Sequence, residues 1–88
     1  MDIIVFGSLK PDCKNCRRAE TLVEKIIQGT DVVYRKLSLD SAEAKSFRVM
    51  VTPTIVVNDT IVALGEVPPA DRLTEYIHGE LEKEGSRP

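Results

Sequence analysis

The feature that most constrains the fold is a run of apolar residues near the N terminus, Ile3-Ile4-Val5-Phe6. A short, uninterrupted apolar run is typical of a strand that is buried on both faces. Such a strand needs other elements packed against both sides of its sheet, so the run predicts a layered α/β domain. The chain has 88 residues, which is enough for one domain of this kind and too few for two.

The apolar pattern further along the chain alternates between helical and strand periodicity. Asp40 followed by Glu43 resembles a capping box that opens a short helix. Pro69 suits the first turn of a last helix. In chain order we predict a strand at residues 3–6, a helix at 13–28, a strand at 32–37, a short helix at 40–47, strands at 54–57 and 61–64, and a helix from Pro69 to about Leu81.

The order β-α-β-α-β-β-α predicts a mixed four-stranded sheet flanked by helices. The first two strands are joined by a helix, so they should be parallel. The last two strands are separated only by Asn58-Asp59-Thr60 and should form an antiparallel hairpin. We expect residues 1–84 to form the domain and residues 85–88 to be a tail.

Composition limits the partners that the chain can have. Twelve Lys and Arg against 14 Asp and Glu give a net charge of −2, which does not favour binding to nucleic acid or to an anionic membrane. The start of the chain carries Asp2 where a signal peptide needs a base, and its apolar run is too short for an export signal or a membrane span. We therefore expect a cytoplasmic protein.

The two cysteines, Cys13 and Cys16, are the only ones and are three residues apart. Closing so short a loop restrains the unfolded chain little, so a bridge between them would not serve as a structural staple. At the start of a helix, Cys13 would meet unpaired N–H groups and the helix dipole, which stabilise a thiolate. Cys16 falls on the apolar stripe of the helix and should be buried. The nearby charges favour a thiolate too, with Lys10, Lys14, Arg17 and Arg18 against Asp12.

This environment predicts a redox pair in which Cys13 attacks a disulfide and Cys16 resolves the mixed disulfide. The pair could instead be half of a zinc site with His78, or an accidental pair of core cysteines. A soft-metal carrier for copper or zinc is the alternative from another functional class. Copper-carrier domains end in a strand, however, whereas this chain ends in a predicted helix. A non-enzymatic adaptor that only docks partners is a third reading.

Val51-Thr52-Pro53-Thr54 precedes the third predicted strand. Together with the strand and the C-x-x-C at a helix start, this segment makes the chain resemble the thioredoxin superfamily, and most closely the small, glutaredoxin-sized thioredoxins of archaea. The resemblance covers residues 3–81. It implies a thioredoxin-like fold and a dithiol–disulfide oxidoreductase without a cofactor. It also implies a cis Thr52–Pro53 bond that lies against the cysteines, where Thr52 and Pro53 bind an extended substrate segment.

The resemblance further implies the partners: disulfide-containing protein substrates and an upstream electron donor of the thioredoxin-reductase type, with the chain acting as a monomer. The sequence departs from the family pattern at particular positions. Lys14 and Asn15 stand between the cysteines, and residues 3–6 offer no buried carboxylate behind them. Arg48 stands where many relatives have glycine. Gly65 is followed by Glu66, whereas glutaredoxins have a Gly-Gly-type turn there.

Overall fold

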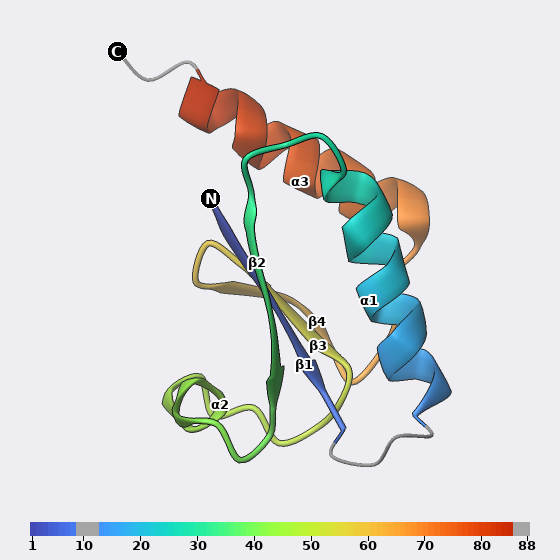
Figure 1. Ribbon diagram of the computed structural model, residues 1–88, viewed down its shortest axis with the longest axis vertical. Helices are drawn as coiled ribbons and strands as arrows, with labels where there is room; N and C mark the ends of the chain where they lie inside the picture. The colour runs from blue at the N-terminus through green and yellow to red at the C-terminus, as the bar shows by residue number, and fades with distance from the viewer. Residues whose placement is uncertain (9–12, 86–88) are drawn as a thin grey trace.

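The structure is a computed structural model that describes residues 1–8 and 13–85. Within these residues the element order is the predicted β-α-β-α-β-β-α, and the four strands form one mixed sheet with the order β2-β1-β3-β4 (Figure 1). The elements are β1 (Asp2–Gly7), α1 (Lys14–Ile27), β2 (Val33–Ser38), α2 (Ala42–Ser46), β3 (Thr54–Val57), β4 (Thr60–Leu64) and α3 (Ala70–Gly85). Helix α3 thus includes Gly85, the first residue of the segment expected to be a tail. No helix in the described part of the chain is long and apolar enough to cross a membrane.

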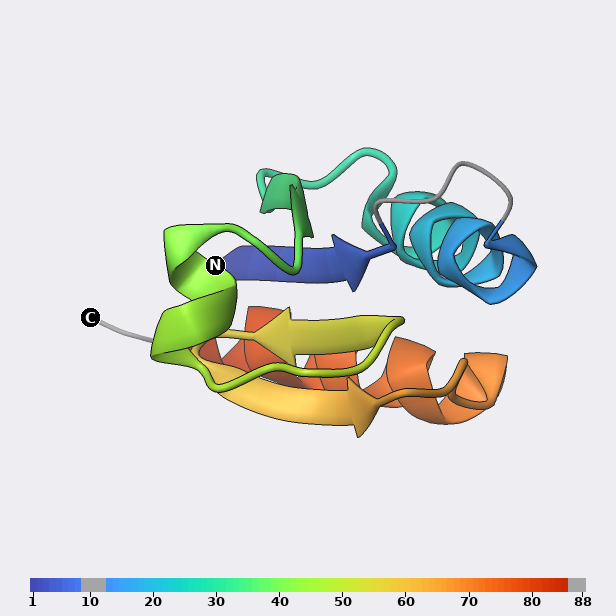
Figure 2. The ribbon, with the colours of Figure 1, turned by 90° about the horizontal axis from the view of Figure 1, so that it is seen from below.

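Strand β1 occupies the centre of the sheet together with β3. It pairs in parallel with β2 and antiparallel with β3, which in turn pairs antiparallel with β4. These pairings confirm the parallel first pair and the final hairpin. The end of β1 and the start of β3 therefore lie at the same end of the sheet, next to the first turn of α1 (Figure 2).

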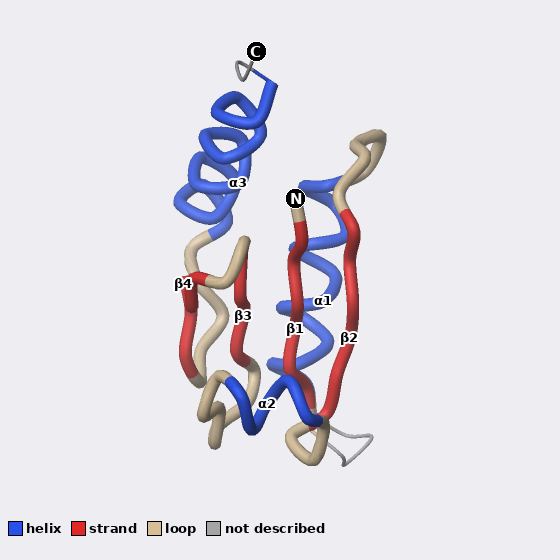
Figure 3. Tube along the Cα trace, turned by 90° about the vertical axis from the view of Figure 1, so that its left-hand side faces the viewer, coloured by secondary structure: helices blue, strands red, loops and turns tan. Residues whose placement is uncertain are grey.

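The sheet separates two hydrophobic clusters, because its side chains alternate between the two faces. Helices α1 and α3 cover one face, and α2 covers the other (Figures 1 and 3). Ile3 and Val5 of β1 belong to the cluster under α1 and α3, whereas Ile4 and Phe6 belong to the cluster under α2. The apolar run at the N terminus is thus a strand buried on both faces, as predicted.

The cap of α2 differs from the prediction. Ser41, not Asp40, is the N-cap residue: its backbone is extended, and its hydroxyl accepts a hydrogen bond from the Ala44 N–H at 3.1 Å. Asp40 instead accepts a hydrogen bond from the Ser38 hydroxyl within the turn before the helix. Both residue types are good caps, so the turn geometry decided which one is used.

Helix α2 ends in a turn that normally needs glycine. Arg48 has a φ of 59°, its N–H bonds to the Lys45 carbonyl at 3.1 Å, and the Val49 N–H bonds to the Ala44 carbonyl at 2.8 Å. This pattern is a Schellman motif with Arg48 in its left-handed position. The conformation explains why glycine suits this site, and why an arginine there is strained.

The β3–β4 turn contains two residues rather than the predicted three. Val57 pairs with Thr60, and Asn58 and Asp59 between them have φ values of 47° and 68°. Two consecutive positive φ values characterise a type I′ turn, which Asn and Asp tolerate better than most residues.

Candidate active site

The cysteine pair lies where β1 leads into α1. Cys13 is the N-cap of α1, and Cys16 lies in the first turn. The two are joined by a disulfide, with their Cα atoms 5.3 Å apart. Cys16 is 4% exposed and shares the inner side of α1 with the buried Ala19 and Val23, whereas Cys13 is only half-buried. The helix was predicted to begin at Cys13, whereas it begins at Lys14 and Cys13 is its N-cap residue.

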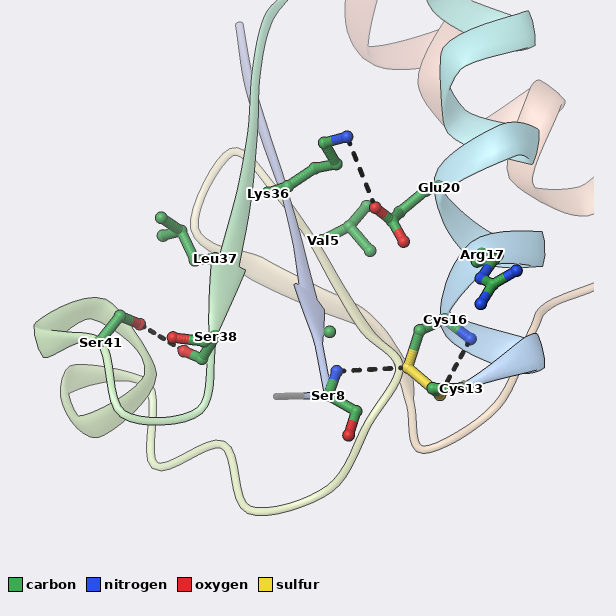
Figure 4. A pocket seen from close by; sticks show the side chains of 11 residues that line it. Val5, Ser8, Cys13, Cys16, Arg17, Glu20, Lys36, Leu37, Ser38 and Ser41 are labelled. Carbon is green, nitrogen blue, oxygen red and sulfur yellow. Dashed lines mark hydrogen bonds and ion pairs between the residues drawn. A yellow bond between two sulfur atoms is a disulfide. The ribbon is translucent and has the colours of Figure 1, made fainter. Parts of the chain in front are cut away.

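Each sulfur accepts a backbone hydrogen bond (Figure 4). The Cys16 N–H donates to Cys13 Sγ at 3.3 Å, in the place where a serine or aspartate oxygen usually caps a helix. The Ser8 N–H donates to Cys16 Sγ at 3.4 Å. N–H groups aimed at sulfur favour the negatively charged thiolate once the disulfide is reduced.

The charge around the pair is positive on α1, whose first turn contains no acidic residue. Lys14, Arg17 and Arg18 follow Cys13 directly, as the sequence indicated. Lys10 and Asp12, which also entered the sequence prediction, lie outside the described residues.

Thr52 and Pro53 lie at the start of β3. The bond between them is cis, and Pro53 is fully buried. Thr54 pairs with Phe6, so Pro53 and Gly7 each come directly next to the last residue pair of the β1–β3 ladder. A Cβ built on Gly7 would lie 3.8 Å from the Cβ of Cys16, so the end of β1 packs closely against the first turn of α1.

The backbone around Pro53 is anchored on one side only. The Pro53 carbonyl accepts a hydrogen bond from the Gly65 N–H at 2.8 Å, and the Thr54 hydroxyl donates to the Val51 carbonyl at 2.8 Å. By contrast, no described residue forms a hydrogen bond with the backbone N–H or carbonyl of Thr52. Thr52 thus has main-chain groups without a hydrogen-bond partner among the described residues, two positions before β3.

A pocket of about 570 Å³, partly lined by Cys13 and Cys16, opens between α1 and β2 (Figure 4). Glu20 of α1 and Lys36 of β2 span it with an ion pair of 3.7 Å. Sequence reasoning missed both residues. Glu20 lies one helical turn beyond Cys16, so its position near the disulfide could have been predicted from helical spacing. The position of Lys36 could not, because it depends on the pairing of Lys36 with Val5 in the sheet.

Tyr34 of β2 packs against the core under α1, and its hydroxyl is buried without a hydrogen-bond partner among the described residues. Burial, and then the negative charges of Glu24 and Glu20, raise the pKa of Tyr34 above its ordinary value. The neutral phenol is therefore the form that the folded protein favours.

The alternative hypothesis from the sequence is that the two cysteines bind a metal ion. In residues 1–8 and 13–85, no group of three or more His, Cys, Asp or Glu side chains is placed to hold a metal ion. The described elements follow the order β-α-β-α-β-β-α, which differs from the β-α-β-β-α-β order of the copper-carrier domains.

Comparisons with known proteins point the same way. The model of a thioredoxin domain family matches residues 1–78. No curated protein sequence matches significantly. Among solved structures, a malarial protein is 25% identical with a TM-score of 0.64, over 89% of this chain and 93% of that one. Thioredoxin-2 of the malaria parasite, a component of its protein secretion machinery, is 25% identical with a TM-score of 0.65, over 89% and 81% of the two chains.

A mutant thioredoxin from Halobacterium salinarum NRC-1 shares the fold, with 23% identity and a TM-score of 0.62 over 89% of this chain and 74% of that one. The family match covers most of the chain, and the described fold carries a C-x-x-C disulfide at the start of α1. This chain belongs to the thioredoxin domain family.

Proposed function

We propose that the protein is a dithiol–disulfide oxidoreductase in which Cys13 is the nucleophile and Cys16 the resolving cysteine. The asymmetry of the pair carries this proposal. Cys16 is buried at 4% exposure and faces the core, whereas Cys13 caps the helix and is more accessible. A disulfide in a substrate protein therefore reaches the Cys13 sulfur first.

The reaction exchanges two disulfide bonds. The reduced Cys13 thiolate attacks one sulfur of the substrate disulfide, forming a mixed disulfide and releasing the other substrate sulfur as a thiolate. The Cys16 thiolate then attacks Cys13 Sγ, which forms the Cys13–Cys16 bond and releases the first substrate sulfur. The substrate gains two electrons, its released thiolates take up protons from water according to their pKa values, and the protein is left as the disulfide described above.

The backbone N–H groups that point at the sulfurs support this sequence of steps. The N–H of Cys16 and the dipole of α1 stabilise negative charge on Cys13, both as attacking thiolate and as leaving group. The N–H of Ser8 does the same for Cys16 before it attacks.

Thr52 and Pro53 form the proposed substrate dock. The unpaired main-chain groups of Thr52 are suited to an extended substrate segment, which would add to the start of β3 as a short strand. Pro53 is buried directly before the first residue of β3 and would fix where those groups lie.

The electron donor is proposed to be a reductase of the thioredoxin-reductase type, and the substrates to be proteins with accessible disulfides. We place the protein in the cytoplasm as a monomer. The only disulfide is the reactive pair itself, so no structural bridge ties the fold to an oxidising compartment.

Single cysteine variants test the assignment with a fluorescent peptide that contains an intramolecular disulfide. Cys16→Ser should accumulate a covalent complex with the peptide, seen by non-reducing electrophoresis, because the resolving step is lost. Cys13→Ser should trap none. If both variants trap the peptide equally, or if Cys13→Ser alone traps it, the roles are wrong.

The same reduced protein tests the metal-carrier alternative. Reduction of the peptide in the presence of a chelator supports the redox function, because the chelator removes any metal. A protein that fails to reduce the peptide but binds one zinc or copper ion tightly through both cysteines would be a metal carrier instead.

A further inference from the structure

The outward side of α1 carries a row of positive charges that begins directly after Cys13. The buried residues of this helix, Cys16, Ala19 and Val23, mark its inner side. At 100° per residue, Lys14, Thr21 and Lys25 lie opposite this inner side, and Arg17 and Arg18 flank them. We call them the basic face: Lys14, Arg17, Arg18, Thr21 and Lys25.

The charges of the basic face are not balanced within α1. Of the two acidic residues of α1, Glu20 pairs with Lys36 of β2, and Glu24 lines a depression together with Thr21 and Lys25. The four cations of the basic face therefore outnumber the two carboxylates of the helix. Among the described residues, none forms an ion pair with Lys14, Arg18 or Lys25. This concentration of positive charge lies on a protein whose net charge is −2.

The basic face is also hollowed, and the hollow adjoins the active-site pocket. A depression of about 340 Å³ is lined by Leu22 together with four residues of the basic face, Arg17, Arg18, Thr21 and Lys25. Arg17 lines both this depression and the pocket that contains the disulfide (Figure 4). From Lys14 to Lys25 the helix rises by about 16 Å, so a short segment of a partner bound to Cys13 can lie along it.

We infer that the basic face is a docking surface for acidic protein segments that flank the disulfide of a substrate or electron donor. The inference rests on the proposed function, because Cys13 brings the partner to this position. Carboxylates of the partner would meet the guanidinium groups of Arg17 and Arg18 and the Lys25 ammonium, while an apolar side chain would lie against Leu22. The basic face thus selects acidic partners by raising their rate of association.

Two disulfide peptides test this inference. They share one sequence with an intramolecular disulfide and differ only at four flanking positions, which are Asp in one and Lys in the other. We expect the reduced protein to react with the acidic peptide roughly ten-fold faster at low ionic strength, within the usual range of electrostatic steering. At 1 M salt, where the screening length falls to about 3 Å, the ratio of the two rates should approach one.

Charge reversal locates the effect. In the double variant Arg18→Glu/Lys25→Glu, the ratio of the rate with the acidic peptide to the rate with the basic peptide should fall to one or below. The ratio is compared because any change in thiol reactivity affects both rates equally. The matched control is Lys45→Glu/Arg72→Glu, which reverses two exposed cations on other helices and should keep the wild-type ratio. Equal rates with the unmodified protein, or an unchanged ratio in Arg18→Glu/Lys25→Glu, would overturn the inference.

Two further measurements separate the remaining outcomes. The uncharged compound 2-hydroxyethyl disulfide serves as a reference substrate. If the protein reduces none of the three substrates, the proposed function fails. If the protein reduces all three equally fast, only the docking inference fails. A DNA duplex and an acidic peptide without cysteine are then compared as inhibitors of the reduction of the acidic disulfide peptide. If the DNA inhibits more strongly, the basic face binds nucleic acid and the inference is overturned.

Discussion

Replacing Tyr34 by phenylalanine tests the one buried side-chain oxygen or nitrogen that has no hydrogen-bond partner among the described residues. The Tyr34 ring packs against the core under α1, and its hydroxyl has no hydrogen-bond partner. Phenylalanine keeps the ring and removes only this oxygen. An unsatisfied buried donor costs about 1–3 kcal/mol, so Tyr34→Phe should raise the free energy of unfolding at pH 7 by about 1 kcal/mol.

The same hydroxyl gives stability a specific dependence on pH. Burial and the carboxylates of Glu24 and Glu20 raise the pKa of Tyr34 above its ordinary value. Below pH 10 the phenol is neutral in both the folded and the unfolded chain, and it contributes no slope. Above about pH 10 the unfolded chain loses this proton while the folded chain keeps it, so stability falls by up to about 1.4 kcal/mol per pH unit.

Urea denaturation at pH 7, 10 and 11, followed by circular dichroism, measures both effects. Tyr34→Phe should be the more stable protein at pH 7, and its advantage should grow by up to about 1 kcal/mol between pH 10 and 11. Tyr76→Phe is the matched control, since Tyr76 is 38% exposed on α3 and its replacement should leave the alkaline loss as in the wild type. An advantage of Tyr34→Phe that stays constant from pH 7 to 11 would refute the reasoning.

Three further predictions concern the turn after α2, the disulfide and the substrate dock. Arg48→Gly should raise the free energy of unfolding by about 1 kcal/mol, because glycine adopts the left-handed conformation without strain. Lys45→Gly inside α2 should lower the free energy of unfolding by a similar amount. Equal effects of the two substitutions in urea titrations would contradict this reasoning. Reducing the Cys13–Cys16 bond should lower the free energy of unfolding by at most about 2 kcal/mol, because a four-residue loop is closed; a reduced protein that melts entirely at 25 °C would contradict it. Pro53→Ala should slow peptide disulfide reduction roughly ten-fold, the equivalent of about one backbone hydrogen bond to Thr52, while the far-ultraviolet spectrum stays unchanged; an unaltered rate would remove Pro53 from the dock.

Local patterns in the sequence were sufficient for the element order and for the placement of the two cysteines at the start of α1. The apolar run in β1 could be read as doubly buried because side chains alternate across a strand, and both hydrophobic clusters contain two of its residues. Cys13 and Cys16 could be placed at a helix start because the apolar spacing after them is helical. Propensities did not separate Asp40 from Ser41 as the cap of α2, since both side chains can accept the same N–H bond.

The surroundings of the disulfide depend on contacts between segments distant in the chain, and only the tertiary structure decided them. The register of β1 against β3 pairs Phe6 with Thr54, next to Pro53, and the parallel pairing with β2 brings Lys36 across from Glu20. The same packing buried the Tyr34 hydroxyl without a partner. Short-range periodicity specifies which face of an element is apolar. The position of a polar side chain facing another element follows from register and layer packing, which local sequence does not encode.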